Sequence, residues 1–178
     1  MLPGSGDGMK EIIFEVPNKI QTGGRLMKSK EVPQKRPKRI PIREDLFTAP
    51  LDNLEQVRMK GSRCQDCSEV FMGKVTTCAN CSSTKLEDLI LSNRGTLWTY
   101  TFIRYQPPGD YKGQVNPFIP FAEGLVELPE GIRVLAPVKE CDFEKIRIGM
   151  SLDLVVHELF QDSDGNPVVA FYFRPASA

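Results

Sequence analysis

Two closely spaced pairs of cysteines constrain this 178-residue chain more than any other feature. Cys64-Gln65-Asp66-Cys67 is followed, after ten intervening residues, by Cys78-Ala79-Asn80-Cys81. Each pair fits a tight turn that points both sulfurs at one ion, and two such turns supply the tetrahedral thiolate cage that structural zinc prefers. The predicted zinc ligands are Cys64, Cys67, Cys78 and Cys81. A fully coordinated ion leaves no position for water or substrate, so this site would be structural.

Two other arrangements use the same cysteines. A rubredoxin-like iron centre has the same four ligands, but no redox partner motif accompanies them here. Two disulfides are disfavoured because the N-terminus lacks a charged segment followed by an apolar one, as a secretion signal would have. We therefore expect a reducing, cytoplasmic environment, in which disulfides rarely persist. The fifth cysteine, Cys141, is expected to be a small buried apolar residue.

The residues around the cysteines predict a rubredoxin-like zinc ribbon over residues 45–92. Val70 and Phe71 follow the first pair, and a short apolar run, residues 86–91, follows the second. A segment this short cannot hold a core unaided, so the metal would contribute much of its folding energy. We expect the ribbon core to be separate from that of the following domain, so that Cys78→Ser would unfold the ribbon alone.

The C-terminal part predicts a five-stranded OB-fold barrel over residues 93–178, which makes the chain mainly β. Five apolar runs are separated by turn signals, and a short helical turn with Gly149 at its end fits between the third and fourth runs. Five strands with a helix in that place match the plan of an OB-fold. The runs are residues 95–104, 118–128, 132–138, 152–159 and 168–174.

The N-terminal residues 1–44 are predicted to form an extended basic arm. They carry ten Lys and Arg and five Asp and Glu, whereas residues 82–178 carry nine and thirteen. Prolines at positions 33, 37 and 41 exclude a continuous helix, and residues 11–16 resemble a strand. The arm is either a solvated tail or a segment that lies on a partner protein or an acidic ligand.

The residue inventory argues against catalysis by the chain alone. It contains a single histidine, His157, which lies in a predicted strand, and no phosphate-binding loop or dinucleotide fingerprint. The cluster Asp162–Asp164 lacks the glutamate that closes a calcium loop and is better explained as a surface turn. No apolar stretch approaches the roughly 18–20 residues of a membrane span. We expect no enzymatic activity from the isolated chain.

Several of these motifs together resemble the zinc-ribbon and OB-fold family that accompanies thiolases. The resemblance covers about residues 40–175. It rests on the two cysteine pairs with Phe71 between them and on several short motifs, which are Asp45-Leu46-Phe47-Thr48, Gly61-Ser62-Arg63-Cys64, Arg94-Gly95-Thr96, Tyr100-Thr101, Pro117-Phe118 and Arg147-Ile148-Gly149-Met150. Two positions depart from the family pattern. Ser68 replaces a glycine, and Lys74 stands where the family often has an arginine that can form a bidentate contact.

The resemblance implies a non-catalytic accessory subunit that binds a thiolase catalytic subunit in a hetero-oligomer and helps to hold the coenzyme A part of an acyl-CoA. A coenzyme A site requires cations near an aromatic shelf. The loop after the first barrel strand offers that mixture, so the predicted contacts are Arg104, Tyr105, Tyr111, Lys112 and Phe118.

Two alternative functions stay open at this stage. An OB-fold that binds single-stranded nucleic acid would use Trp98, Tyr100 and Phe102 for stacking, although the chain has no net charge and residues 82–178 are net acidic. An adaptor without a ligand is the second alternative, and co-purification with or without a thiolase would separate it from the accessory subunit.

Overall fold

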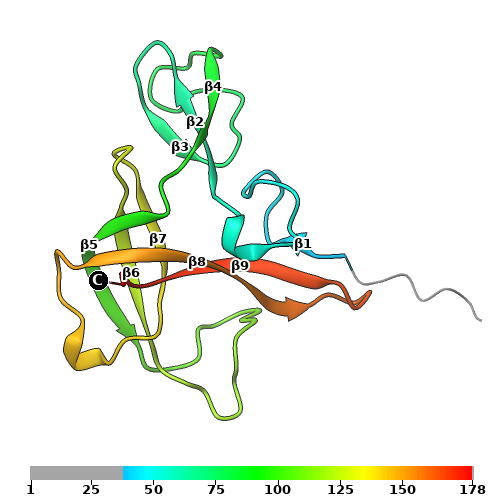
Figure 1. Cartoon of the computed structure of the whole chain (residues 1–178), viewed down its shortest axis with the longest axis vertical. Helices are drawn as coiled ribbons and strands as arrows, with labels where there is room; N and C mark the ends of the chain where they lie inside the picture. The colour runs from blue at the N-terminus through cyan, green and yellow to red at the C-terminus, as the bar shows by residue number, and fades with distance from the viewer. Residues whose placement is uncertain (1–37, 178) are drawn as a thin grey trace, which may run out of the picture. The chain divides into compact units, whose positions relative to one another are not determined.

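The computed structural model describes residues 38–177, and its regular secondary structure consists of strands and two short 3-10 turns (Figure 1). The predicted strand at residues 11–16 and nearly all of the basic arm lie outside the described residues. The barrel strands are β5 (Arg94–Ile103), β6 (Phe121–Glu127), β7 (Arg133–Val138), β8 (Ser151–Gln161) and β9 (Pro167–Pro175). The 3-10 turn η2 (Phe143–Lys145) lies between β7 and β8, where the sequence predicted a helical turn.

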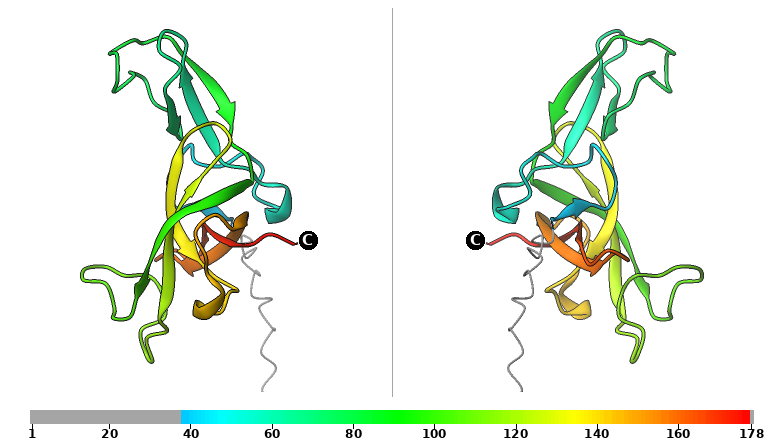
Figure 2. Two further views of the ribbon diagram at one scale, coloured as in Figure 1. Left: turned by 90° about the vertical axis from the view of Figure 1, so that its left-hand side faces the viewer. Right: turned by 90° about the vertical axis from the view of Figure 1, so that its right-hand side faces the viewer.

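The pairing of these strands is that of a closed OB-fold barrel (Figure 2). β5, β6 and β7 form an antiparallel meander, and β8 pairs with both β5 and β9. The circle closes between β7 and β9, which run parallel and share the register pair Val138 and Phe173. The predicted fold class is therefore confirmed.

Alternation of side chains along each strand explains why this sequence forms a barrel. In β6, Ala122, Gly124 and Val126 are buried and the residues between them are not, so every second position faces the core. Any side chain at position 124 would force its neighbours to move, because a Cβ there would lie 2.7 Å from Leu97 Cδ1. A β-bulge interrupts β5 between Leu97 and Thr99 and shifts the register against β6.

The cysteine pairs belong to a second, three-stranded sheet, here called the ribbon. It contains β2 (Lys60–Cys64), β3 (Val70–Met72) and β4 (Leu86–Ile90), with β2 in the centre and both neighbours antiparallel to it. The short 3-10 turn η1 (Leu54–Gln56) precedes it. β2 leads directly into the first cysteine, so the sheet fixes where the first pair begins.

The expectation of two separate cores is wrong. Met59 and Leu91 flank the ribbon strands, and both are fully buried in the same apolar cluster as Leu97, Leu128 and the other barrel residues. The backbone N–H of Leu91 also donates to the carbonyl of Met59 at 2.9 Å. The base of the ribbon is therefore part of the barrel core, because three strands alone cannot bury enough apolar surface.

The described end of the basic arm adds a short strand, β1 (Ile40–Pro41), parallel to β9. Arg39 fixes it, since its side chain donates to Glu158 Oε1 at 2.6 Å and to the carbonyl of Asp52 at 2.8 Å. Residues 38–44 are thus attached to the barrel. The predicted domain boundaries at 44/45 and 92/93 stay predictions. No helix in residues 38–177 is long and apolar enough to cross a membrane.

Candidate metal centre and ligand cavity

The four cysteines of the two pairs meet at one point. Their sulfur atoms all lie within 4.8 Å of one another, with Cys64 Sγ 3.6 Å from Cys81 Sγ and Cys67 Sγ 3.5 Å from Cys78 Sγ. A tetrahedron with zinc–sulfur bonds of about 2.3 Å has edges of about 3.8 Å, so this arrangement fits a metal ion. The thiols are free, and these separations are far longer than the roughly 2.05 Å of a disulfide.

Backbone hydrogen bonds act on the pKa values of two of the cysteine thiols and favour their thiolate forms. The N–H of Glu69 lowers the pKa of Cys67 to about 7, with help from Asn80. The N–H of Ser83 acts in the same direction on Cys81, but the neighbouring thiols and burial outweigh it and raise the pKa of Cys81 to about 12. Four thiolates cannot coexist this closely without a positive charge, which a divalent metal would supply.

Two serines shape the turns that carry the cysteines. Ser68 and Ser82 each follow the second cysteine of a pair, and both have positive φ values, 64° and 61°. That conformation favours glycine, which explains the physical role of the family glycine that Ser68 replaces. Ser68 N–H donates to the carbonyl of Cys64 and Ser82 N–H to that of Cys78, both at 2.9 Å, so each turn closes as expected.

Two further polar residues, which the sequence did not single out, hold the ribbon together. Asp66, inside the first cysteine pair, accepts from Ser83 Oγ at 2.7 Å and from Lys85 Nζ at 3.3 Å, which lowers the pKa of its carboxyl. Ser62 is buried in β2 and donates to the carbonyl of Gly73 at 3.0 Å. Only the folded structure reveals these partners, because they are 11 to 19 residues apart in sequence.

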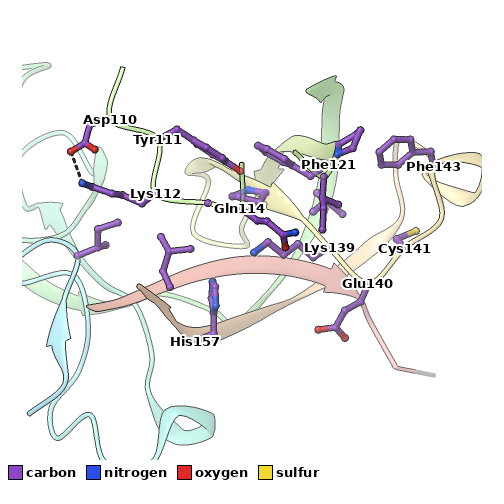
Figure 3. Close-up of a pocket in the computed structure, with 17 residues that line it drawn as sticks. Asp110, Tyr111, Lys112, Gln114, Phe121, Lys139, Glu140, Cys141, Phe143 and His157 are labelled. Carbon is purple, nitrogen blue, oxygen red and sulfur yellow. Dashed lines mark ion pairs between the residues drawn. The ribbon is translucent and has the colours of Figure 1, made fainter. Parts of the chain in front are cut away.

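A cavity of about 710 Å³ lies against the barrel, beside the long loop that joins β5 to β6 (Figure 3). Its walls come from that loop, from the end of β7 and the residues after it, and from β8. Apolar side chains supply most of the lining, and the polar residues include Gln114, Lys139 and His157. Its volume is in the range of sites that bind small molecules.

The predicted coenzyme A contacts are only partly brought together. Tyr111 and Lys112 line the cavity, and Tyr111 is stacked parallel to the ring of Phe121 at 6.3 Å between centroids. Phe118 contacts Tyr111 edge-on, whereas Arg104 lies over the ring of Phe102 at 5.5 Å. Tyr105 is 84% exposed. The five residues share a loop but no single surface, and their role stays a prediction.

The cavity also contains residues whose role the sequence did not indicate. Lys139 directly follows β7, and burial lowers the pKa of its ammonium group. His157 is half-buried in β8 with its ring edge-on to Tyr172 at 5.0 Å, and burial followed by the charge of Lys139 lowers its pKa. Cys141, which was expected to be buried, is only partly buried against the core. In the sequence, the one indication of a role for Lys139 was its position as a charged residue directly after a predicted strand.

The aromatic residues considered for nucleic-acid stacking do not form one surface. Tyr100 and Phe102 are partly buried, and Phe102 packs against Phe143 of η2 at 4.4 Å between centroids. Trp98 is instead 47% exposed, and the guanidinium carbon of Arg133 lies 3.5 Å from the centre of its ring. The aromatic platform required by single-strand binding is thus absent from these residues of the described chain.

Comparisons with known proteins agree with this architecture. A family model described as the C-terminal OB-fold domain of ChsH2 matches residues 90–157. The subunit BbsA of benzoylsuccinyl-CoA thiolase from Thauera aromatica is 27% identical over 150 residues, which is 82% of this chain and 98% of the relative. A DUF35 domain-containing scaffold protein from Methanothermobacter thermautotrophicus is 30% identical over 123 residues, 68% of this chain and 89% of the relative. The solved structure of an Ltp2-ChsH2(DUF35) aldolase matches with a TM-score of 0.51 at 26% identity, covering 67% of this chain and 86% of that one.

The chain belongs to the DUF35 family of thiolase-associated OB-fold proteins. Within that family its sequence resembles the small subunit of benzoylsuccinyl-CoA thiolase, and a second BbsA subunit, from Geobacter metallireducens, is 27% identical over 148 residues. The resemblance found in the cysteine, Gly-Thr and Ile-Gly-Met motifs is therefore confirmed at the level of the family.

Proposed function

We propose that this chain is the zinc-binding, non-catalytic subunit of a thiolase, with a cytoplasmic location and benzoylsuccinyl-CoA thiolase as the particular complex. The observation that carries the proposal is the match to BbsA along 98% of that subunit. The inventory of residues supports it, because four of five cysteines converge on a metal site and the chain has one histidine. Claisen chemistry requires an activated cysteine with nearby bases, which a partner would provide.

Co-purification tests this proposal directly. The full chain, expressed with a cleavable tag in its native host, should retain a thiolase catalytic subunit identified by mass spectrometry. The isolated chain should show no thiolytic cleavage of an acyl-CoA, and the recovered complex should show it. Activity of the highly purified chain alone, or retention of no thiolase, would contradict the proposal and favour an adaptor function.

The outer face of β5, β6 and β7 is our candidate for the thiolase contact. Its members, here called the Trp98 face, are Trp98, Leu125, Arg133 and Leu135. The β-bulge in β5 leaves both Trp98 and Thr99 exposed, and Leu135 is 60% exposed beside Leu125. Arg133 is held over the Trp98 ring and donates to Glu127 Oε1 at 3.1 Å, so the pair is ordered before binding. Tryptophan and arginine are the residues most enriched at binding hot spots.

Truncation of the Trp98 face should weaken the complex. We expect Trp98→Ala to reduce affinity for the thiolase subunit by at least about tenfold, since hot-spot truncations typically cost 2 kcal/mol or more. Affinity is measured by titrating the purified subunits against each other. The matched control is Ile90→Ala, which truncates an exposed apolar side chain of β4, outside this face. Equal affinities for wild type and Trp98→Ala would place the contact elsewhere.

The proposal also includes a contact between the β5–β6 loop and coenzyme A. Lys112→Ala in the complex should raise the KM for the acyl-CoA and spare kcat, because the contact is remote from the chemistry. Lys112 already forms an ion pair with Asp110 at 2.5 Å and is partly exposed, so we expect a loss of about 1 kcal/mol, roughly fivefold in KM. Arg104→Ala is tested in parallel. Unchanged kinetics for both variants would assign coenzyme A wholly to the thiolase.

A further inference from the structure

We propose that the cavity beside the β5–β6 loop binds a small apolar carboxylic acid, with the carboxylate at Lys139 Nζ and the hydrocarbon body against the apolar wall. This ligand needs no nucleotide and no thioester, so the inference goes beyond the proposed coenzyme A contact. It rests on the composition of the cavity and on the unbalanced charge within it.

The wall of the cavity is suited to a hydrocarbon. Apolar side chains from four segments of the described chain line it, among them Ile42, Ile119, Phe121, Val138, Phe143 and Leu159. Ile119 is 56% exposed in the protein alone, so a ligand would remove it from water. Burial of each additional methylene group should raise affinity by about fourfold.

Lys139 provides the only charge in this cavity that lacks a counter-charge among residues 38–177. Its backbone N–H donates to the carbonyl of Phe173 at 2.9 Å, which holds it at the end of β7, and its ammonium group lies 5.1 Å from the centre of the Tyr172 ring. No carboxylate of the described residues lies within ion-pair distance of it. Its depressed pKa agrees with an ammonium group that has lost water without gaining an anion.

The other charged groups at the cavity are already engaged. Lys112 pairs with Asp110, as the dashed line in Figure 3 marks. Glu140 accepts from the hydroxyl of Tyr172 and from Arg174, and it forms no ion pair with Lys139. Gln114 and His157 line the same cavity as Lys139, and all three side chains are drawn in Figure 3. An anion at Lys139 would thus find a cation without a counter-charge in largely apolar surroundings.

Two ligands of equal chain length, one with a charged head group and one with a neutral head group, test the assignment. The probes are octanoate and 1-octanol, titrated into the full chain by calorimetry. We expect Lys139→Met to weaken octanoate binding at least tenfold and to change 1-octanol binding by less than twofold, whereas Lys139→Arg should retain octanoate within about threefold. The matched control is Lys145→Met, which removes an exposed lysine that pairs with Asp142.

Three results would overturn the inference: absence of octanoate binding to the wild-type chain, equal loss of both probes in Lys139→Met, or an unchanged octanoate affinity in that variant. Coenzyme A is titrated as a third probe. If coenzyme A binds and octanoate does not, the cavity belongs to the coenzyme A contact and the inference falls, while the thiolase proposal is judged separately by co-purification.

Discussion

Removal of the metal is expected to unfold the distal part of the ribbon and to lower the stability of the barrel. We expect one zinc ion per chain by elemental analysis, and its loss on chelation or in Cys78→Ser. Structural zinc contributes about 10–16 kcal/mol of binding free energy in small folded units. The three short strands β2, β3 and β4 bury too little apolar surface to give a comparable stabilisation. Backbone amides of β3 and the cysteine turns should then exchange rapidly with solvent.

The shared core makes this prediction differ from one for independent domains. Because Met59 and Leu91 pack into the barrel cluster, melting of the ribbon weakens their anchoring, and the midpoint of barrel unfolding should fall by roughly 4–8 °C for each kcal/mol lost. Cys141→Ser is the matched control, since it removes a thiol away from the metal site. Iron in place of zinc, or a barrel midpoint that chelation leaves unchanged, would contradict the prediction.

The sequence predicted those parts of the structure that depend on local pattern. Cysteine spacing was sufficient to predict that the four cysteines meet at one point, because each turn needs only its own four residues and the ten-residue spacer limits how far apart the turns can lie. The apolar runs and the turn signals between them were sufficient to predict the five barrel strands in their order along the chain. The parallel pairing of β7 with β9 was not predicted, because no local signal in the sequence encodes a parallel pair.

The features that the sequence did not predict depend on contacts between distant segments. Met59 and Leu91 are ordinary apolar residues in sequence, and nothing local assigns them to the barrel core instead of the ribbon. Lys139 likewise appears as a surface lysine after a strand, and its burial becomes visible only when β8 and the β5–β6 loop are placed around it. The five loop residues predicted to contact coenzyme A do not lie together, because the Arg104 side chain turns toward Phe102 and Phe143.

The second large effect is expected at the seam that closes the barrel. Among the residues that the structure describes, β7 and β9 share one register pair, Val138 with Phe173, together with the hydrogen bond from Lys139 N–H to the Phe173 carbonyl. A ladder of one register pair contributes little to the stability of the closed barrel. Closure must therefore depend on the burial of apolar side chains at the seam. Phe173 is fully buried and the largest side chain in that class. We therefore expect Phe173→Ala to lower the free energy of unfolding by about 3–5 kcal/mol.

Denaturant unfolding followed by tryptophan fluorescence measures this loss, because Trp98 lies in the same barrel. Leu135→Ala is the matched control, since it truncates an exposed residue of β7 and should change stability by no more than about 0.5 kcal/mol. Phe173→Ala should also reduce octanoate binding, because the carbonyl that positions Lys139 belongs to the residue whose anchoring is lost. A destabilisation below 1 kcal/mol would mean that the β8–β9 and β8–β5 ladders alone hold the barrel closed.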